Sequence, residues 1–398
     1  MKRNNHIEKC VNWQEIYVKK VDIRSLILNI LIVCLYILSI YYLFNCILKS
    51  ESFSMIDYIL LFIVICYISI TVHEVAHSLA YIFHRMRIRA IYIYPFCFIK
   101  NKNNWKTLIN FNCVGLMGAS VVDLFEINND DDFKRVTEAF ANSMLCATIS
   151  GIIMTILGLV LIIIGYVAGE NKSLVDVGGL LFAINFVLVI NCFARSGNVG
   201  GDYFAYKYMF KNNEISAQFI FNYIKLSSNY NEIRRNNTYL RKMLIKIFER
   251  KVEEDITNID AISIATGFIS DFLAAKIDLP ESIKIYLKDF YRNTDKFSKV
   301  KNIEIYKKFI TRVACYYEFI GKHEIAEKLY NDLIINFPKG EVDNYYKLQA
   351  EQIILHKDNY AILSDRKNIK PDTFYTFYRL FDGYISDEVY INGLRNSK

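Results

Sequence analysis

Uninterrupted runs of apolar residues fill the first half of the chain, whereas charged residues recur at helical spacing in the second half. A helix needs about 20 apolar residues to cross the hydrocarbon core of a bilayer. Four segments reach that length, at residues 26–48, 55–83, 139–168 and 174–194. They predict a polytopic bundle of membrane helices. The alternative for the last two segments is a buried hairpin in the core of a soluble protein.

The residues between the second and third apolar segments have the composition of β-strands. Aromatic and β-branched residues fill 91–99 and 108–122, and a polar turn at 100–106 separates them. This pattern predicts a short β-hairpin at the membrane surface. A re-entrant segment is the alternative, tolerated at membrane depth only where it is buried in protein or lines a wet cavity. The acidic stretch at 129–132 predicts a turn before the third segment.

The chain from about residue 210 onward has the periodicity of soluble helices. The clearest of these are predicted at 237–254, 260–276, 281–292 and 345–356. Residues 305–338 match the offsets of a tetratricopeptide repeat, a helix pair with small residues at its crossing. The matching residues are Ala314, Tyr317, Gly321, Ala326, Tyr330 and Pro338. Any other helical hairpin is the alternative for this segment.

Together these patterns predict a mainly α-helical protein of three parts. A cytosolic segment at residues 1–24 precedes a transmembrane domain at 25–210, and a soluble, repeat-like helical domain follows at 211–398. Of the 398 residues, 53% are hydrophobic and 22% are charged, which excludes a disordered or collagen-like chain. The net charge of +7 is mild, and no basic stripe with interleaved aromatic residues predicts nucleic-acid binding.

Lysine and arginine residues predict the orientation of the spans, because short loops rich in them stay in the cytosol. Residues 1–24 carry six of them, and residues 85–106 carry six with no acidic residue among them. The links between the other segments mix single basic and acidic residues. We therefore expect an integral, multi-pass protein of a bacterial cell membrane with both termini in the cytosol.

Nine cysteines are scattered along the chain, and no two of them form a C-x-x-C pair. This spacing argues against a disulfide framework and against a zinc site built from thiolates. Cys34, Cys46, Cys66 and Cys146 fit as small hydrophobic residues of membrane helices.

The strongest chemical signal is His73-Glu74-Val75-Ala76-His77, inside the second apolar segment. Two histidines four residues apart share one face of a helix, so both imidazoles can bind one Zn²⁺ ion. The glutamate next to the first histidine is placed to take a proton from a water that the metal activates. The pattern therefore predicts a hydrolytic zinc site.

The alternative is a polar helix face that is buried against other helices or lies in the membrane interface. Ionisable groups in a membrane helix are costly, at about 2.5–3.5 kcal/mol for a charge at the centre. A shared metal ion compensates two histidines and a glutamate at once, so we favour the metal site.

A catalytic zinc ion takes three protein ligands and keeps a fourth position open. Asp202 is the predicted third ligand, because Gly200 and Gly201 before it let the backbone bend toward the metal. The predicted orientation also places Asp202 on the same side of the membrane as residues 73–77. Capping the helix that follows is the other role open to Asp202. Rival ligands are Asp123, Glu126, Glu138 and His84.

With these motifs, the chain resembles the site-2 protease family of intramembrane zinc metalloproteases over roughly residues 55–210. That family carries its two zinc histidines and its glutamate on one membrane helix, as at 73–77, and an aspartate on a later one, as at Asp202. Its glycine-containing loop corresponds to residues 115–120, which include Gly118.

The chain is a divergent match to that family. Asp202 is followed by Tyr203 where a glycine is usual, and no proline-rich bridge joins Asn191 to Asp202. The middle membrane helix keeps an asparagine, Asn142, but lacks the glycine-proline pair that often precedes it. The histidine motif is the fully matched part of the pattern.

The resemblance implies hydrolysis of peptide bonds in membrane-embedded or membrane-associated peptides and proteins near the cytosolic face, with Zn²⁺ bound by His73, His77 and Asp202. Glu74 would carry a proton from water to the leaving amine. Asn142 would donate to the oxyanion, although an ordinary helix–helix hydrogen bond is the other role open to it. The strands at 91–99 would bind the substrate as an added strand.

Two other classes of function stay open. A different class of membrane zinc protease would use a glutamate as its third ligand. A catalytically inactive membrane scaffold would bind a peptide or protein partner through the helical domain, which is the expected site of a protein partner in either case. A transporter has little in its favour, because four spans without an internal repeat provide no translocation pathway.

Overall fold

The structure is a computed structural model, and two compact units make up the chain. The first unit is Met1–Val72 with Ile149–Asn191, and the second is His73–Thr148 with Cys192–Lys398. The predicted domain boundaries after residues 24 and 210 stay predictions. The residues that the structure describes are 41, 53–101, 104–109, 118–167, 169, 171–196, 199–337, 340–365, 368–369 and 381–394.

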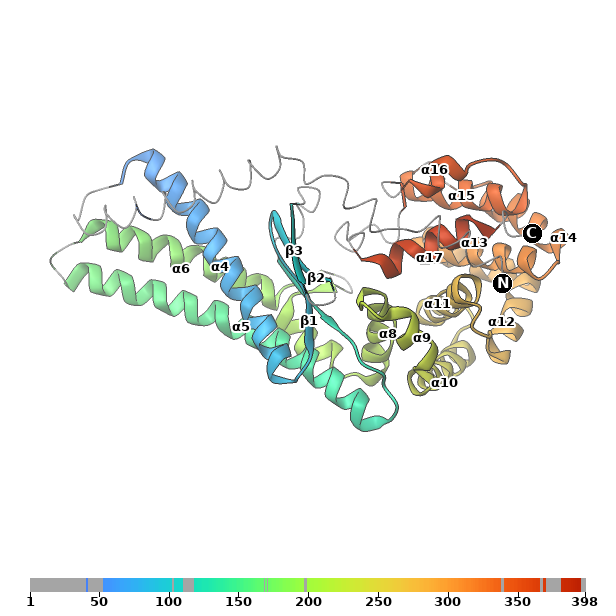
Figure 1. The fold of residues 1–398 in the computed structure, drawn as a ribbon, viewed down its shortest axis with the longest axis horizontal. Helices are drawn as coiled ribbons and strands as arrows, with labels where there is room; N and C mark the ends of the chain where they lie inside the picture. Colours follow the sequence, from blue (N-terminus) through green and yellow to red (C-terminus); the bar gives the residue numbers. More distant parts are fainter. Residues whose placement is uncertain are drawn as a thin grey trace. The chain divides into compact units, whose positions relative to one another are not determined.

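Three described helices are long and apolar enough to cross a membrane: α4 (Met55–Phe83), α5 (Asp130–Val167) and α6 (Lys172–Phe193) (Figure 1). All three coincide with predicted apolar segments. The predicted segment at 26–48 lies outside the described residues, apart from Tyr41.

The predicted turn at 129–132 is instead the beginning of α5. The Asn129 side chain accepts a hydrogen bond from the N–H of Asp132 at 2.9 Å, and Asp130, Asp131 and Asp132 form the first turn of the helix. Carboxylates stabilise this end of a helix because they lie at the positive end of its dipole. The acidic stretch therefore forms the first turn of the helix and is not a separate turn before it.

Within the first unit, α5 and α6 pack closely through glycines. A Cβ atom at Gly158 would collide with the backbone of Gly178 and Phe182, and small residues of this kind let membrane helices approach each other. Asn185 donates a hydrogen bond to Ser69 of α4 at 2.9 Å, and both side chains are buried. Large apolar side chains face outward on the same helices, as lipid contact requires, and include Ile63, Ile163 and Val187.

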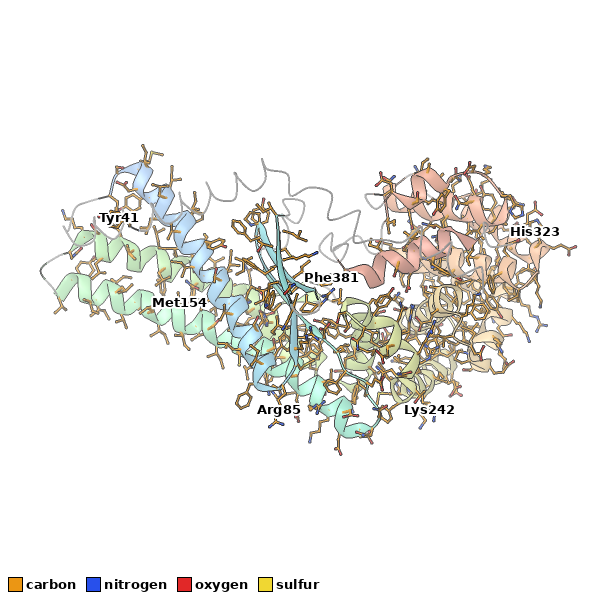
Figure 2. All side chains as sticks on the ribbon, viewed as in Figure 1. Tyr41, Arg85, Met154, Lys242, His323 and Phe381 are labelled. Carbon is orange, nitrogen blue, oxygen red and sulfur yellow. The ribbon has the colours of Figure 1, made fainter. Side chains whose placement is uncertain are left out.

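The second unit contains a four-stranded antiparallel sheet with the strand order β3-β2-β1-β4. After α4, Arg85 adopts a positive φ of 59° and turns the chain toward the first strand (Figure 2). The strands are β1 (Arg87–Ile93), β2 (Phe96–Asn101), β3 (Asn104–Ile109) and β4 (Gly118–Asp123). Strands β3 and β4 form the two edges.

The predicted hairpin is thus part of a larger sheet, and its strand bounds were wrong. The stretch at 91–99 is not one strand, because Tyr94 and Pro95 form a turn that separates β1 from β2. Proline has no N–H to contribute to a strand ladder. Both β1 and β2 are paired on two sides, so neither can accept the added substrate strand that the sequence placed there.

The rest of the second unit is helical, and the predicted helices at 237–254, 260–276, 281–292 and 345–356 are confirmed within a few residues. Two short strands and a short helix follow α6: β5 (Arg195–Ser196), β6 (Val199–Gly200) and α7 (Asp202–Phe204), which continues as the π-helix η1 (Ala205–Met209). The α-helices after these are α8 (Asn213–Tyr223), α9 (Tyr230–Asn236), α10 (Thr238–Glu254), α11 (Ile259–Ala275), α12 (Glu281–Arg292), α13 (Glu304–Phe319), α14 (His323–Leu329), α15 (Glu341–Ile354), α16 (Tyr360–Ser364) and α17 (Asp382–Asn392). Shorter helical turns are η2 (Ile224–Leu226), η3 (Thr294–Val300) and η4 (Tyr330–Ile334).

Helices α13 and α14 form the helix pair that the sequence predicted at 305–338. Gly321, between them, has a φ of 80°, a conformation that glycine adopts without steric cost. A helix pair of this kind is common to many folds, so the tetratricopeptide repeat stays a prediction.

One hydrophobic core joins the sheet to the helices of the second unit. It includes Tyr92 of β1, Phe140 of α5, Ile220 of α8 and Phe268 of α11, all of them fully buried. The sheet and the helices after residue 210 therefore fold as one packed body, which fixes the position of β4.

Two adjacent acidic residues of helix α17 form buried ion pairs with the helices of this core. Asp387 accepts hydrogen bonds from Arg234 at 2.9 Å, and Glu388 accepts one from Arg312, whose side chain is fully buried. A buried charge needs such a partner, because removal from water is costly.

Candidate metal centre

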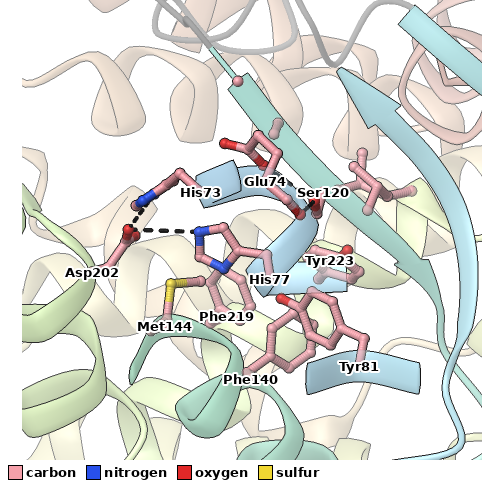
Figure 3. Close-up of a pocket in the computed structure, with 14 residues that line it drawn as sticks. His73, Glu74, His77, Tyr81, Ser120, Phe140, Met144, Asp202, Phe219 and Tyr223 are labelled. Atoms are coloured by element: carbon pink, nitrogen blue, oxygen red, sulfur yellow. Dashed lines mark hydrogen bonds and ion pairs between the residues drawn. The ribbon is translucent and has the colours of Figure 1, made fainter. Parts of the chain in front are cut away.

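Two histidines of α4 and one aspartate of α7 converge at a single point in the second unit. Nε2 of His73 lies 2.8 Å from Oδ2 of Asp202, and Nε2 of His77 lies 3.5 Å from the same oxygen (Figure 3). The structure thus brings together the three side chains that the sequence proposed as ligands, although Asp202 is far from both histidines along the chain.

The two separations from Asp202 are compatible with a shared zinc ion. Zinc binds histidine nitrogen and carboxylate oxygen at about 2.0–2.2 Å in tetrahedral sites, which places neighbouring donor atoms about 3.3 Å apart. The two distances to Asp202 lie on either side of that value. Among the described residues, the side chains close enough to share a metal ion form two groups, His73 with Glu74 and His77, and His73 with Cys192 and Asp202.

Asp202 does not act as the cap of the helix that it begins. The N-cap residue of α7 is Gly201, and no side chain caps this end. Burial disfavours the charged form of the Asp202 carboxyl, but hydrogen bonds from His73 and His77 outweigh burial and hold its pKa below the usual range. The carboxylate is therefore ionised and directed at the histidines, as a metal ligand must be.

Glu74 lies beside the histidines and is only 4% exposed. Ser120 of β4 is within hydrogen-bonding distance of two of its acceptors, the Oε2 atom at 3.1 Å and the main-chain oxygen at 2.9 Å. Ser78 lies 3.1 Å from the Ser120 hydroxyl. A Cβ atom at residue 118 would collide with the Glu74 carboxyl group, so Gly118 provides the space that this side chain occupies.

A second serine orients His77, and the sequence analysis missed it. Oγ of Ser143 lies 2.9 Å from Nδ1 of His77 and 3.4 Å from the main-chain oxygen of that residue. With the hydroxyl proton given to the main-chain oxygen, Ser143 can accept the Nδ1 proton, the arrangement that a zinc-bound His77 needs because its Nε2 must lose its proton to bind the metal. The signal in the sequence was weak, because Ser143 is one of several small polar residues in α5, together with Thr148, Ser150 and Thr155.

Asn142 is directed elsewhere. Its side-chain nitrogen lies 2.8 Å from Nε2 of His84, its side chain is exposed, and it is not among the residues that line the pocket around Glu74. The role of oxyanion donor stays a prediction for this residue.

The rival ligands have other partners. Asp123 lies 3.7 Å from Arg87 and accepts from the N–H of Ser228. Glu126 accepts from Asn236, and Glu138 pairs with Lys134. None of these carboxylates belongs to a metal-binding group among the described residues, whereas Cys192, whose Sγ lies 3.9 Å from Oδ2 of Asp202, does.

The metal-binding groups open into a pocket of about 300 Å³. Its polar part holds His73, Glu74, His77 and Asp202, and residues 118–121 of β4 form one wall. The remaining lining is apolar or aromatic and consists of Tyr81, Phe140, Met144, Phe219, Tyr223 and Leu226 (Figure 3). The arrangement places the Glu74 carboxyl group and the candidate metal ligands beside the edge strand β4.

Comparison with known proteins agrees with this geometry. The sequence profile of Peptidase family M50 matches residues 61–332, more than half of the chain, and this range contains all three proposed ligands and Glu74. No curated protein and no solved structure matches the chain. Family M50 is the site-2 protease family of intramembrane metalloproteases. The chain therefore belongs to Peptidase family M50, and with its three apolar helices it is an integral membrane protease.

Proposed function

We propose that this protein is a zinc endopeptidase that cuts membrane-embedded or membrane-associated peptides near the cytosolic face of the membrane. The observation that carries the proposal is the convergence of His73, His77 and Asp202 beside the buried carboxyl group of Glu74. In this assignment His73, His77 and Asp202 hold Zn²⁺, and Glu74 is the general base.

A zinc ion bound by these three residues would supply Lewis acidity to a peptide carbonyl and to water. Glu74 then takes a proton from the attacking water and delivers it to the leaving nitrogen. The hydrogen bond from Ser120 keeps the carboxyl group in place for both transfers.

The substrate must present an extended backbone, because a helical peptide shields its amides in internal hydrogen bonds. Strand β4 is an edge of the sheet, and its residues 118–121 line the pocket that contains Glu74. An unwound substrate can therefore pair with β4 as an added strand. This replaces the pairing that the sequence analysis placed on residues 91–99.

Charge supports a cytosolic location for the site. The end of α4 that carries the histidines is followed by a group of basic residues, Arg85, Arg87, Arg89, Lys100 and Lys106. Basic residues next to a span favour the cytosolic side. Both termini are proposed to lie on that side.

The test is a comparison of membrane peptides in cells that express the wild type or Glu74→Gln. Loss of a general base costs about 10²–10⁴ in rate, so substrates should accumulate and their products should disappear in the variant. The purified variant should still bind zinc, because Glu74 is not a proposed ligand. Identical peptide profiles in the two strains would mean that the protein does not hydrolyse peptides through Glu74.

A further inference from the structure

The outer edge of β4 is divided into an open part and a closed part. Successive residues of a strand direct their N–H and C=O groups alternately to the two sides. Val122 and Leu124 donate their N–H groups away from β1, to the Tyr223 hydroxyl at 2.8 Å and to Ser227 Oγ at 2.9 Å. By the same alternation, Gly118 and Ser120 also direct their main-chain groups outward.

The closed part is formed by the helical region of the chain. Tyr223 ends α8 and Ser227 follows η2, about a hundred residues after β4. Both side chains are buried, and the Tyr223 ring packs on Phe140 with 4.8 Å between ring centroids. The two hydroxyl groups therefore occupy the positions where a further strand would pair with Val122 and Leu124.

The open part lies beside the proposed catalytic groups. Gly118, Ala119 and Ser120 are partly exposed, whereas Val121 and Val122 are buried. Among the residues that the structure describes, β4 pairs with β1 alone. Ser120 is also the residue that holds Glu74, and Tyr223 stands in the same pocket (Figure 3).

We propose that Tyr223 and Ser227 limit the strand pairing of a substrate to Gly118 and Ser120. This inference rests on the proposed function and adds a specificity-determining role for the helical domain. An added strand can form main-chain hydrogen bonds with these two outward residues only. Tyr223 stops the strand at Val122 and so determines which peptide bond reaches Glu74.

The number of paired substrate residues can be measured from the positions at which proline prevents cleavage of library peptides. Proline has this effect because it cannot donate a hydrogen bond to a strand ladder. The full-length protein in detergent micelles would be incubated with a proteome-derived peptide library, and cleavage sites would be identified by mass spectrometry. Cleavages that persist with Glu74→Gln would be discarded. We expect proline to be depleted at two alternate substrate positions in the wild-type profile.

The variant Tyr223→Leu removes the hydroxyl and the ring tip that block Val122 while keeping an apolar side chain in the core. Proline depletion should extend from two alternate positions to three. The matched control is Tyr230→Leu, because the Tyr230 hydroxyl contacts Ser386 of α17 and not the sheet. The control should keep the two-position profile.

The wild-type profile tests the proposal even if Tyr223→Leu does not fold. Depletion of proline at three or more alternate positions in the wild-type profile would overturn the proposal, and so would no depletion at any position. An unchanged profile in a folded and active Tyr223→Leu protein would also overturn it. In these cases Glu74-dependent cleavage would still stand. Absence of any Glu74-dependent cleavage would instead reject the proposed function, and the proposed limit on strand pairing would then be rejected as well.

Discussion

Ser143 of α5 lies 2.9 Å from Nδ1 of His77 of α4, although 66 residues separate the two along the chain. Both side chains are buried. When the hydroxyl accepts the Nδ1 proton, Nε2 is the nitrogen that can bind a metal ion. Metal-binding histidines commonly depend on a partner of this kind.

Ser143→Ala should weaken zinc binding by about 10–100-fold, the usual cost of losing a group that orients a metal ligand. Zinc affinity can be measured by competition with a chelator, and nitrogen NMR of His77 should show a loss of the single tautomer. The matched control is Thr137→Val on the same helix, because the buried Thr137 hydroxyl bonds to main-chain oxygens of its own helix. Equal affinity in the wild type and Ser143→Ala would contradict the assigned role.

Asp202→Ala should release most of the bound zinc. The carboxylate is the group that both histidines contact, and a catalytic zinc site needs three protein ligands. Metal content of the purified protein can be measured by mass spectrometry of the elements. His84→Ala is the control, because His84 bonds to Asn142 and should leave the zinc content unchanged. A full complement of zinc in Asp202→Ala would favour a different third ligand.

Gly118→Ala should reduce hydrolysis by about 10²-fold or more while the zinc content stays the same. The added Cβ would displace the Glu74 carboxyl group, and a shift of about 1 Å in a catalytic group can cost that much. Rates would be measured on a peptide found in the Glu74→Gln comparison. Gly179→Ala is the matched control, since a Cβ there meets nothing within 4 Å. Normal activity in Gly118→Ala would show that Glu74 tolerates displacement.

Glu388→Gln should destabilise the helical part of the protein at neutral pH. Burial favours the neutral acid, but the charge of Arg312 outweighs burial and lowers the pKa of Glu388 to about 2. Removing one partner of a buried ion pair costs about 3–5 kcal/mol, and the Arg312 charge would lose its carboxylate partner while keeping its hydrogen bond to Gln349.

This effect has a defined pH window. A carboxyl group whose pKa is lower in the folded state stabilises the protein fully above its unfolded pKa of about 4.3, and loses that contribution as the pH falls toward about 2. The difference between wild type and Glu388→Gln in urea midpoints, followed by circular dichroism, should therefore shrink below about pH 4.3. The exposed residue Glu324 provides the control, because Glu324→Gln should change stability by less than about 0.5 kcal/mol at any pH. A constant difference from pH 7 to pH 3 would contradict the ion pair.

The sequence alone determined the features that depend on local spacing. Apolar runs predicted α4, α5 and α6, because the thickness of a bilayer sets the length of a span. The four-residue interval between His73 and His77 predicted a shared helix face, because one turn of helix has nearly that period. These features need no knowledge of distant contacts.

The tertiary structure decided everything that joins distant parts of the chain. It made β4 an edge strand, directed Asp202 toward the histidines, and brought Ser120 and Ser143 to Glu74 and His77. It also turned Asn142 toward His84. Local periodicity fixes which residues share a face of one element, but which elements meet depends on the packing of the whole core, and no interval in the sequence encodes that pairing.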